Sequence, residues 1–279
     1  MLSIRPMTLA DVPFGMRLKD QAGWNQTEAD WRRFLSLQPD GCFVAEMAGQ
    51  PAGTVTTSVF DSVAWIAMVL VDKASRGKGI GTRLVEYALE HLDARGVRSI
   101  RLDATALGRP IYEKLGFFPQ YELARMEGTA WNVDRDAAVE PVSDDLLAAV
   151  AELDCRVSGT NRHRLIELLR RESSGRMWTA RDSSGVVGYA AVREGSRAGQ
   201  IGPAVSLSVD AGRDLVDAAV RECGGRPLFV DVPLDNAAAV HWAEAGGLAV
   251  QRNFTRMCRG EPLLDHPELI WASSGPEKG

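Results

Sequence analysis

Three glycines stand at alternate positions in the stretch VDKASRGKGIGTR, residues 71–83, directly behind Arg76. Gly77, Gly79 and Gly81 leave the backbone bare, because glycine has no Cβ and adopts conformations that other residues avoid. A helical pattern follows, and the first N–H groups of a helix lack internal partners at the positive end of its dipole. Such a place binds phosphate. The spacing therefore predicts a site for a phosphorylated ligand.

The elements on either side of this loop must position it. The apolar run at 63–71 predicts a strand that is buried on both faces. After the glycines, apolar residues recur at every fourth position from Ile80 and Leu84, which predicts a helix that ends near Gly96. The segment 98–104 alternates as a strand. Strand, loop, helix and strand in this order predict a right-handed crossover between parallel strands.

The flanking segments indicate an α/β fold with a mixed sheet. Thr8 and Asp11 form a helix-start pattern that resembles a capping box. We expect further helices at 27–37 and 107–116, and strands at 42–47, at 52–60 and from Phe117 onward.

Two common phosphate-binding loops do not fit the glycines. A Walker A loop needs Lys and Ser or Thr after its last glycine, and the dinucleotide pattern GxGxxG needs glycine where Thr82 stands. The pattern Arg76-x-x-Gly79-x-Gly81 fits a third loop, together with the strand before it, the helix after it and a downstream Tyr112-x-x-x-Gly-Phe. This combination resembles the acyl-CoA pyrophosphate loop of the GNAT acetyltransferase superfamily. The alternative is a glycine-rich turn without a ligand.

The resemblance implies acetyl-CoA as co-substrate. The first strand would splay from the next, and the pantetheine arm would lie in the gap and pair with the Val71 backbone. The Val69 N–H would stabilise the oxyanion that forms during acyl transfer. Backbone groups of the loop would bind the pyrophosphate, and these cofactor-binding residues are Arg76, Gly77, Lys78, Gly79, Ile80, Gly81 and Thr82.

Tyr112 matches a tyrosine that often serves as general acid in this family. The resemblance implies that Tyr112 also lies against the cofactor. It would protonate the departing CoA thiolate. The alternative is a tyrosine that only packs on its own short helix.

The general base is not evident from the motif. Where some branches of the family carry a carboxylate, this chain has Trp65, which accepts no proton. Asp61, Glu46 and Asp103 lie on or beside expected strands, and a chain of water molecules is the alternative to all three. Thr105 stands where many members of the family carry asparagine, which affects contacts with the substrate rather than the fold.

The acceptor amine is expected near the first two helices, which border the acceptor site in this superfamily. We place Trp24, Asp61 and Trp65 there as candidate substrate-binding residues, although packing in the core is the commoner role of tryptophan. Cys42 begins a strand remote from the loop, so we expect direct attack by the amine rather than an acylated side chain.

A second copy of the same fold follows the first. A shift of 131 residues carries Arg125 onto Arg256 and Met126 onto Met257, and it also aligns GTRLVEYAL with GRDLVDAAV. RSIRLDA and RPLFVDV correspond at a shift of 128, with Asp103 on Asp231. We therefore expect two tandem GNAT-like domains, at 1–128 and 139–272, each a mixed, splayed sheet flanked by helices.

The second copy lacks the chemistry of the first. The shift places Leu207 at Arg76, Asp210 at Gly79 and Ala243 at Tyr112. An aspartate near a pyrophosphate is electrostatically unfavourable. We expect this copy to have no cofactor site and to help enclose the acceptor pocket, since ligand sites favour domain interfaces. A purely structural role is the alternative.

Composition narrows the class of protein. The net charge of −5 argues against a nucleic-acid binder and mildly favours a cationic acceptor. The four cysteines and four histidines are scattered, so we expect no metal site and no disulfides. No apolar run is long enough to span a membrane, and the N-terminus lacks the apolar core of a signal peptide, so we expect a cytoplasmic protein. Nothing in the sequence sets the oligomeric state.

These observations predict an N-acetyltransferase that transfers acetyl from acetyl-CoA to a primary amine in a ternary complex. The acceptor remains open and includes polyamines, antibiotics, amino acids and protein N-termini. The alternative is a non-catalytic acyl-CoA sensor that binds a partner through its second half. A different acyl group is also compatible with the motif.

Overall fold

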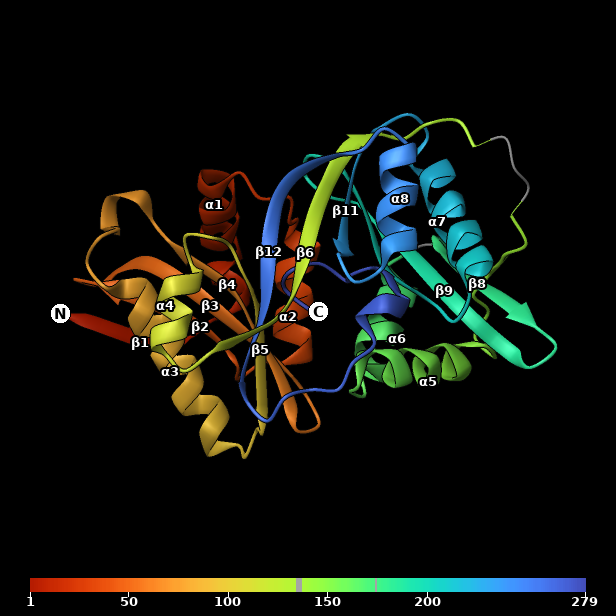
Figure 1. Cartoon of the computed structure of the whole chain (residues 1–279). Coiled ribbons are helices and arrows are strands. Elements are labelled where there is room, and N and C mark those ends of the chain that lie inside the picture. The colour runs from red at the N-terminus through yellow and green to blue at the C-terminus, as the bar shows by residue number, and fades with distance from the viewer. Residues whose placement is uncertain (134–136, 174) are drawn as a thin grey trace.

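The computed structural model describes residues 1–133, 137–173 and 175–279. It has two halves, each with helices packed on a sheet, and one continuous sheet runs through both (Figure 1). The strand order is β1-β2-β3-β4-β5-β12-β6-β11-β10-β9-β8-β7, and β13 pairs with β10 outside this path. The fold is therefore mixed α/β, as the sequence predicts.

The first copy, expected at residues 1–128, begins with a strand that the sequence analysis does not predict, β1, which pairs with β2. The expected helices and strands of this half are all present, within one or two residues of their expected bounds. The elements are β1 Leu2–Pro6, η1 Leu9–Asp11, α1 Val12–Ala22, α2 Glu28–Leu37, β2 Cys42–Met47, β3 Gln50–Phe60, β4 Val63–Val71, η2 Lys73–Ser75, α3 Ile80–Ala94, β5 Ser99–Ala104, α4 Arg109–Lys114 and β6 Phe118–Thr129.

The second copy, expected at residues 139–272, repeats the same order of helices and strands and adds β13 at its end. Its elements are β7 Glu140–Pro141, α5 Leu147–Ser158, α6 His163–Glu172, β8 Met177–Asp182, β9 Gly185–Arg193, β10 Gly199–Ser206, α7 Val209–Cys223, β11 Pro227–Pro233, α8 Ala237–Ala245, β12 Ala249–Gly260, η3 Pro267–Leu269 and β13 Ile270–Ala272. Strands β6 and β12 are each twelve residues long, and their bounds differ by the 131 residues of the sequence repeat. Residues 134–136 of the segment between the copies lie outside the described residues.

The helix starts follow from local chemistry. The Thr8 N–H donates to the Asp11 carboxylate at 2.8 Å, which completes the expected capping box before α1. Thr27 and Asp30 form the same arrangement at the start of α2.

Helix α3 buries its apolar face, including Leu84 and Ala88, in the core of the first copy. Among the described residues, no helix is both long and apolar enough to cross a membrane.

Strands β4 and β5 are parallel but separate along most of their length. Only Val63–Trp65 of β4 pairs with Ser99–Arg101 of β5, so the remaining two thirds of β4 diverges from its neighbour. Such a splayed pair opens a cleft at the centre of the sheet.

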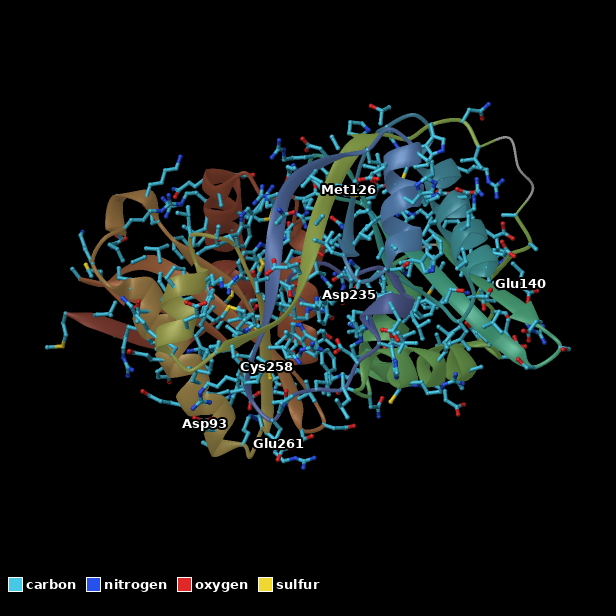
Figure 2. The ribbon with its side chains drawn as sticks, viewed as in Figure 1. Asp93, Met126, Glu140, Asp235, Cys258 and Glu261 are labelled. Carbon is cyan, nitrogen blue, oxygen red and sulfur yellow. The ribbon has the colours of Figure 1, made fainter. Side chains whose placement is uncertain are left out.

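The last long strand of each copy, β6 or β12, lies in the space between the two copies. β12 pairs with β5 of the first copy, β6 pairs with β11 of the second, and β6 and β12 pair with each other. They cross the middle of the molecule side by side, with Met126 on β6 and Cys258 on β12 both buried (Figures 1 and 2). Each copy therefore needs the other to complete its sheet, and elements from both copies meet at the first cleft.

Candidate active site

A cleft of about 650 Å³ opens where β4 and β5 separate. Its walls come from the glycine-rich loop, β4, the α4 segment, the loop after α1 and strands β6 and β12. Most of the residues that the sequence analysis assigns to the cofactor line it: Val69, Val71, Arg76, Gly77, Gly79, Ile80, Gly81, Thr82 and Tyr112. Lys78 is not among the lining residues, and its Nζ lies 3.4 Å from the Ala74 carbonyl oxygen.

The glycine-rich loop has a backbone that only glycine adopts easily. Gly77 and Gly79 have φ values of 75° and 74°, and a Cβ at either position would meet no atom within 4 Å. Gly79 is the residue before the first turn of α3, so the free N–H groups of that turn face open space. This bare cradle at a helix N-terminus fits a pyrophosphate group.

A bulge interrupts β4 beside the cleft. Ala67 pairs with Thr56 and Leu70 with Thr54, so Met68 and Val69 together oppose one residue of β3. Met68 has a φ of 50°, and its carbonyl accepts a hydrogen bond from Thr54 Oγ1 at 2.9 Å. A bulge redirects backbone groups out of the ladder, which fits the proposed use of the Val69 N–H.

Tyr112 projects from α4 into the same cleft. Its ring packs edge-on against Phe117 at 5.9 Å, and its hydroxyl makes no hydrogen bond within the described parts of the chain. Burial raises the pKa of the Tyr112 hydroxyl to about 12. The phenol is therefore protonated at neutral pH and is able to donate its proton or a hydrogen bond.

The far end of the cleft is built from both copies. Trp24 follows α1, and its neighbour Asn25 binds the second copy: Oδ1 accepts from the N–H groups of Arg197 and Ala198 at 2.9 and 3.1 Å. Arg252 and Phe254 reach the cleft from β12. The second copy thus supplies part of the wall where the acceptor is expected.

Asp61 and Trp65 lie elsewhere, so we do not retain them as acceptor-binding residues. Asp61 occupies the turn between β3 and β4. Trp65 is buried beneath the Arg101 guanidinium, 5.5 Å from its ring, and packs against Phe60. Neither residue lines the cleft.

The residues considered as general base or nucleophile are either hydrogen-bonded to an arginine or buried. Glu46 accepts a hydrogen bond from Arg5 at 2.7 Å on the outer strands of the first copy. Asp103 does line the cleft, but both of its oxygens accept hydrogen bonds from Arg256, at 2.7 and 2.8 Å. Cys42 is buried, and burial raises the pKa of its thiol to about 12, which removes it as a nucleophile.

Glu277 is a cleft residue that sequence reasoning missed. It comes from the segment after β13, which carries neither periodicity nor a motif. Its Oε1 accepts hydrogen bonds from Arg193 at 2.9 Å and from Lys278, and its Oε2 lies 3.3 Å from Gln26 Nε2. Burial raises the pKa of Glu277, but Lys278 and Arg193 outweigh that effect, and the pKa is lowered. This carboxylate is therefore ionised.

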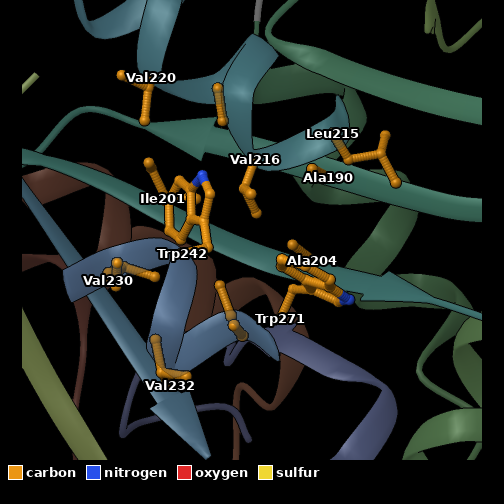
Figure 3. Close-up of a cluster of buried hydrophobic side chains, with 14 of the residues drawn as sticks. Ala190, Ile201, Ala204, Leu215, Val216, Val220, Val230, Val232, Trp242 and Trp271 are labelled. Atoms are coloured by element: carbon orange, nitrogen blue, oxygen red, sulfur yellow. The ribbon is translucent and has the colours of Figure 1, made fainter. Parts of the chain in front are cut away.

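The corresponding cleft of the second copy is filled. Strand β13 pairs with Ala204 and Val205 of β10, and the Ser273 N–H beyond it donates to the backbone carbonyl of Asp231 on β11 at 2.8 Å. The Trp271 ring lies beside Gly212, the counterpart of Gly81, so closely that a Cβ there would be 2.1 Å from it. Figure 3 shows Trp271 packed with Ala204 in the core of this copy.

The glycine-rich loop of the first copy also has no counterpart. Only Leu207 and Ser208 separate β10 from α7, and the Ser208 hydroxyl accepts a hydrogen bond from the Ala211 N–H. Ala243, at the position of Tyr112, is fully buried. The first copy therefore carries the cleft that is open to a ligand.

Two sequence families cover most of the chain. The model described as "Acetyltransferase (GNAT) family" matches residues 9–117, and the one described as "Acetyltransferase (GNAT) domain" matches residues 150–272. Holothin acyltransferase from Pseudoalteromonas sp. is 24% identical over 259 residues, which are 92% of this chain and 87% of that protein. The uncharacterized N-acetyltransferase YitH from Bacillus subtilis is 24% identical over 230 residues, 80% of this chain and 79% of that one.

Solved structures show the same architecture. A putative acetyltransferase from Pyrococcus horikoshii superposes with a TM-score of 0.88 at 25% identity, over 100% of this chain and 96% of that one. A tandem GNAT protein from the clavulanic acid biosynthesis pathway gives a TM-score of 0.68 at 15% identity, over 94% and 99% of the two chains. The second comparison concerns the fold alone.

Proposed function

The chain belongs to the GNAT superfamily of acyltransferases as a tandem-domain member, and we propose that it transfers acetyl from acetyl-CoA to a primary amine. The observation that carries this proposal is the open cleft between β4 and β5, with two left-handed glycines at the start of α3 at one end and Tyr112 beside it. The same cleft is filled in the second copy.

We assign the donor site to the first copy, residues 1–128. Backbone N–H groups of residues 76–82 would bind the pyrophosphate, and the Val71 backbone would pair with the pantetheine arm. The donor supplies an activated acyl thioester. The Val69 N–H, redirected by the bulge, would stabilise the negative charge that develops on the thioester oxygen.

The reaction needs two proton movements. The amine nitrogen forms a bond with the acyl carbon as the bond from carbon to sulfur breaks, and Tyr112 donates a proton to the departing thiolate. The attacking amine must first lose a proton, because an amine with its ordinary pKa is protonated at neutral pH. Water in the cleft would take that proton.

We assign Glu277 to orienting the acceptor. It is ionised and lines the cleft, and its Oε2 has Gln26 Nε2 as its hydrogen-bond partner while Arg193 and Lys278 bind Oε1, so Oε2 would accept a hydrogen bond from the acceptor's ammonium group before that proton leaves. Its lowered pKa makes it a better anchor for a cation than a general base. The second copy, residues 139–272, would contribute Arg252 and Phe254 to the acceptor pocket through β12.

The test has two steps. Titration calorimetry with acetyl-CoA should give one site per chain, and addition of an amine panel should then release CoA, followed with a thiol reagent. Failure to bind acetyl-CoA would overturn the assignment of the loop. Binding without CoA release for any amine would instead favour the acyl-CoA sensor.

A further inference from the structure

Four charged side chains line the acceptor end of the cleft, and three of them form ion pairs with other residues. Arg256 binds both oxygens of Asp103. Asp231 binds two nitrogens of Arg125, at 2.7 and 2.8 Å. Glu277 is paired with Arg193 and Lys278, as described above. The fourth is Arg252.

Arg252 has no acidic partner among the described residues. Its Nε donates to the side-chain oxygen of Gln251 at 3.0 Å, and this contact carries no opposite charge. The two carboxylates that act on its charge have other partners, because Gln251 binds Glu127 and Arg125 binds Asp231. The guanidinium is therefore a half-buried cation that forms no ion pair with the described residues.

The surroundings make this charge unfavourable without a ligand. Burial, Arg125 and Arg197 lower the pKa of Arg252, and they outweigh Asp231 and Glu127, which raise it. Arg125 is its register partner on β6, and the Arg197 guanidinium donates to the Gly23 carbonyl of the loop that carries Trp24. A half-buried cation among like charges is stabilised by an anion.

Arg252 lies at the end of the cleft where the acceptor is expected, and not at the end where the donor's phosphates would bind. Arg252 and Phe254 are two residues apart on β12, so they share one face of the strand, and both line the cleft. The glycine-rich loop lies across the cleft, beyond β4, whereas β12 lies on the other side of β5.

We propose that the acceptor is a small amine that also carries a carboxylate, such as an amino acid or a short peptide, and that Arg252 binds this carboxylate. This inference rests on the proposed function. Arg252 would bind the carboxylate, and Glu277 would orient the ammonium group at the other end of the acceptor. Guanidinium pairs with carboxylate through two parallel hydrogen bonds, which gives geometric selectivity as well as affinity.

The local charge thus reverses the indication from composition. The net charge of −5 favours a cationic acceptor, but charges more than about 10 Å away are largely screened at physiological salt. The groups that line the pocket decide which acceptor binds.

The experiment compares matched acceptors. CoA release is measured with a pool of L-amino acids and X-Gly dipeptides, and with a pool of the same compounds as C-terminal amides. The expected result is a kcat/KM at least about tenfold higher for the free carboxylates, since charge-assisted pairs are among the stronger hydrogen bonds. Arg252→Gln should remove that preference and leave the calorimetric affinity for acetyl-CoA unchanged. Arg259→Gln, on the same strand but paired with Asp93 at the surface, should behave like the wild type.

Several results would overturn the inference. They are equal or better use of the amides, no effect of Arg252→Gln, or weakened acetyl-CoA binding in that variant. If no acceptor releases CoA, the proposed function fails, and a binding titration decides the inference separately. In that titration, N-acetyl amino acids are added to the protein with CoA. Tighter binding than the N-acetyl amides, lost in Arg252→Gln, supports a carboxylate site, and equal binding overturns it.

Discussion

Arg125 of the first copy binds Asp231 of the second copy through two hydrogen bonds of 2.7 and 2.8 Å, and both side chains are buried. The internal repeat produces a second, equivalent ion pair. Arg256 of the second copy binds Asp103 of the first with the same two lengths. Each repeated arginine therefore binds the repeated aspartate of the other copy. The two pairs connect β6 to β11 and β12 to β5, and so hold each of the two long strands against the sheet of the other copy.

Removing one acid of these pairs should be costly. Asp231→Asn leaves the Arg125 guanidinium buried without a counter-charge, so we expect the free energy of unfolding to fall by about 3–5 kcal/mol. Urea denaturation measures it. Asp93→Asn breaks a pair of similar geometry, with Arg259, at the surface near the lower edge of Figure 2, and should cost less than about 1 kcal/mol. Equal losses in the two variants would contradict a special role for the buried pair.

A negative charge at the centre of the glycine-rich loop should abolish binding of acetyl-CoA. Gly79→Asp places a carboxylate at the proposed pyrophosphate site, and we expect loss of calorimetric binding of acetyl-CoA. Gly96→Asp is a matched control, because Gly96 has a φ of 71° and equally open surroundings at the other end of α3. Both variants carry about 1–2 kcal/mol of backbone strain, but only Gly79→Asp should lose binding. Retained binding in Gly79→Asp would refute the site.

Tyr112→Phe separates chemistry from binding. The variant removes the proton donor but keeps the ring that packs on Phe117. We expect kcat to fall by roughly 10²–10⁴-fold, with unchanged affinity for acetyl-CoA and unchanged stability. Because the pKa of Tyr112 is raised to about 12, the wild type should not lose this donor as the pH rises from 7 to 10. A kcat close to the wild-type value in the variant would show that another group protonates the thiolate.

The filled cleft of the second copy should not become a binding site when it is emptied. Trp271→Ala opens a cavity beside Gly212, and we expect a loss of about 3–5 kcal/mol in stability. Acetyl-CoA should still bind at one site per chain, because no glycine-rich loop precedes α7. Two sites in a calorimetric titration of this variant would contradict that explanation.

The free energy of unfolding should fall as the pH is lowered, because the buried Asp30 carboxylate is then protonated. Burial raises the pKa of this carboxyl, but Arg193, Lys278 and Arg33 outweigh burial, and the pKa lies below its ordinary value. A carboxylate with a lowered pKa in the folded state stabilises the protein above its unfolded pKa of about 4, and this stabilisation is lost as the pH falls below that value. Asp30→Asn should be less stable at pH 7 and show a flatter decline in acid by urea denaturation. Asp144→Asn, at a carboxylate that is 95% exposed, should follow the wild type.

Much of the first copy could be predicted because its signals are local. The bounds of β4 match the apolar run at 63–71, and α3 begins and ends within two residues of its expected bounds. The cap of α1 and the left-handed glycines also depend on a few neighbouring residues. The duplication could be found in the sequence because β6 and β12 keep a constant offset.

The acceptor end was less predictable. Trp65 was chosen by its distance along the chain from the loop and Asp61 by its place beside an expected strand, but the structure places both outside the cleft. Glu277 belongs to a segment that carries no motif, and Arg252 lies on the repeated strand β12 but outside any functional motif; both reach the cleft only because the two copies pack together. Residues so far apart in sequence leave no periodic signal to connect them.

The sequence by itself determined most helices and strands of the first copy, the glycine-rich loop and the existence of two copies, since each depends on short-range backbone preferences or on a repeated pattern. Only the tertiary structure decided that the copies exchange β6 and β12, that β13 fills the second cleft and that both copies build the acceptor pocket. Strand pairing and burial depend on which distant surfaces exclude water together. That choice is made by the whole chain and not by any single segment.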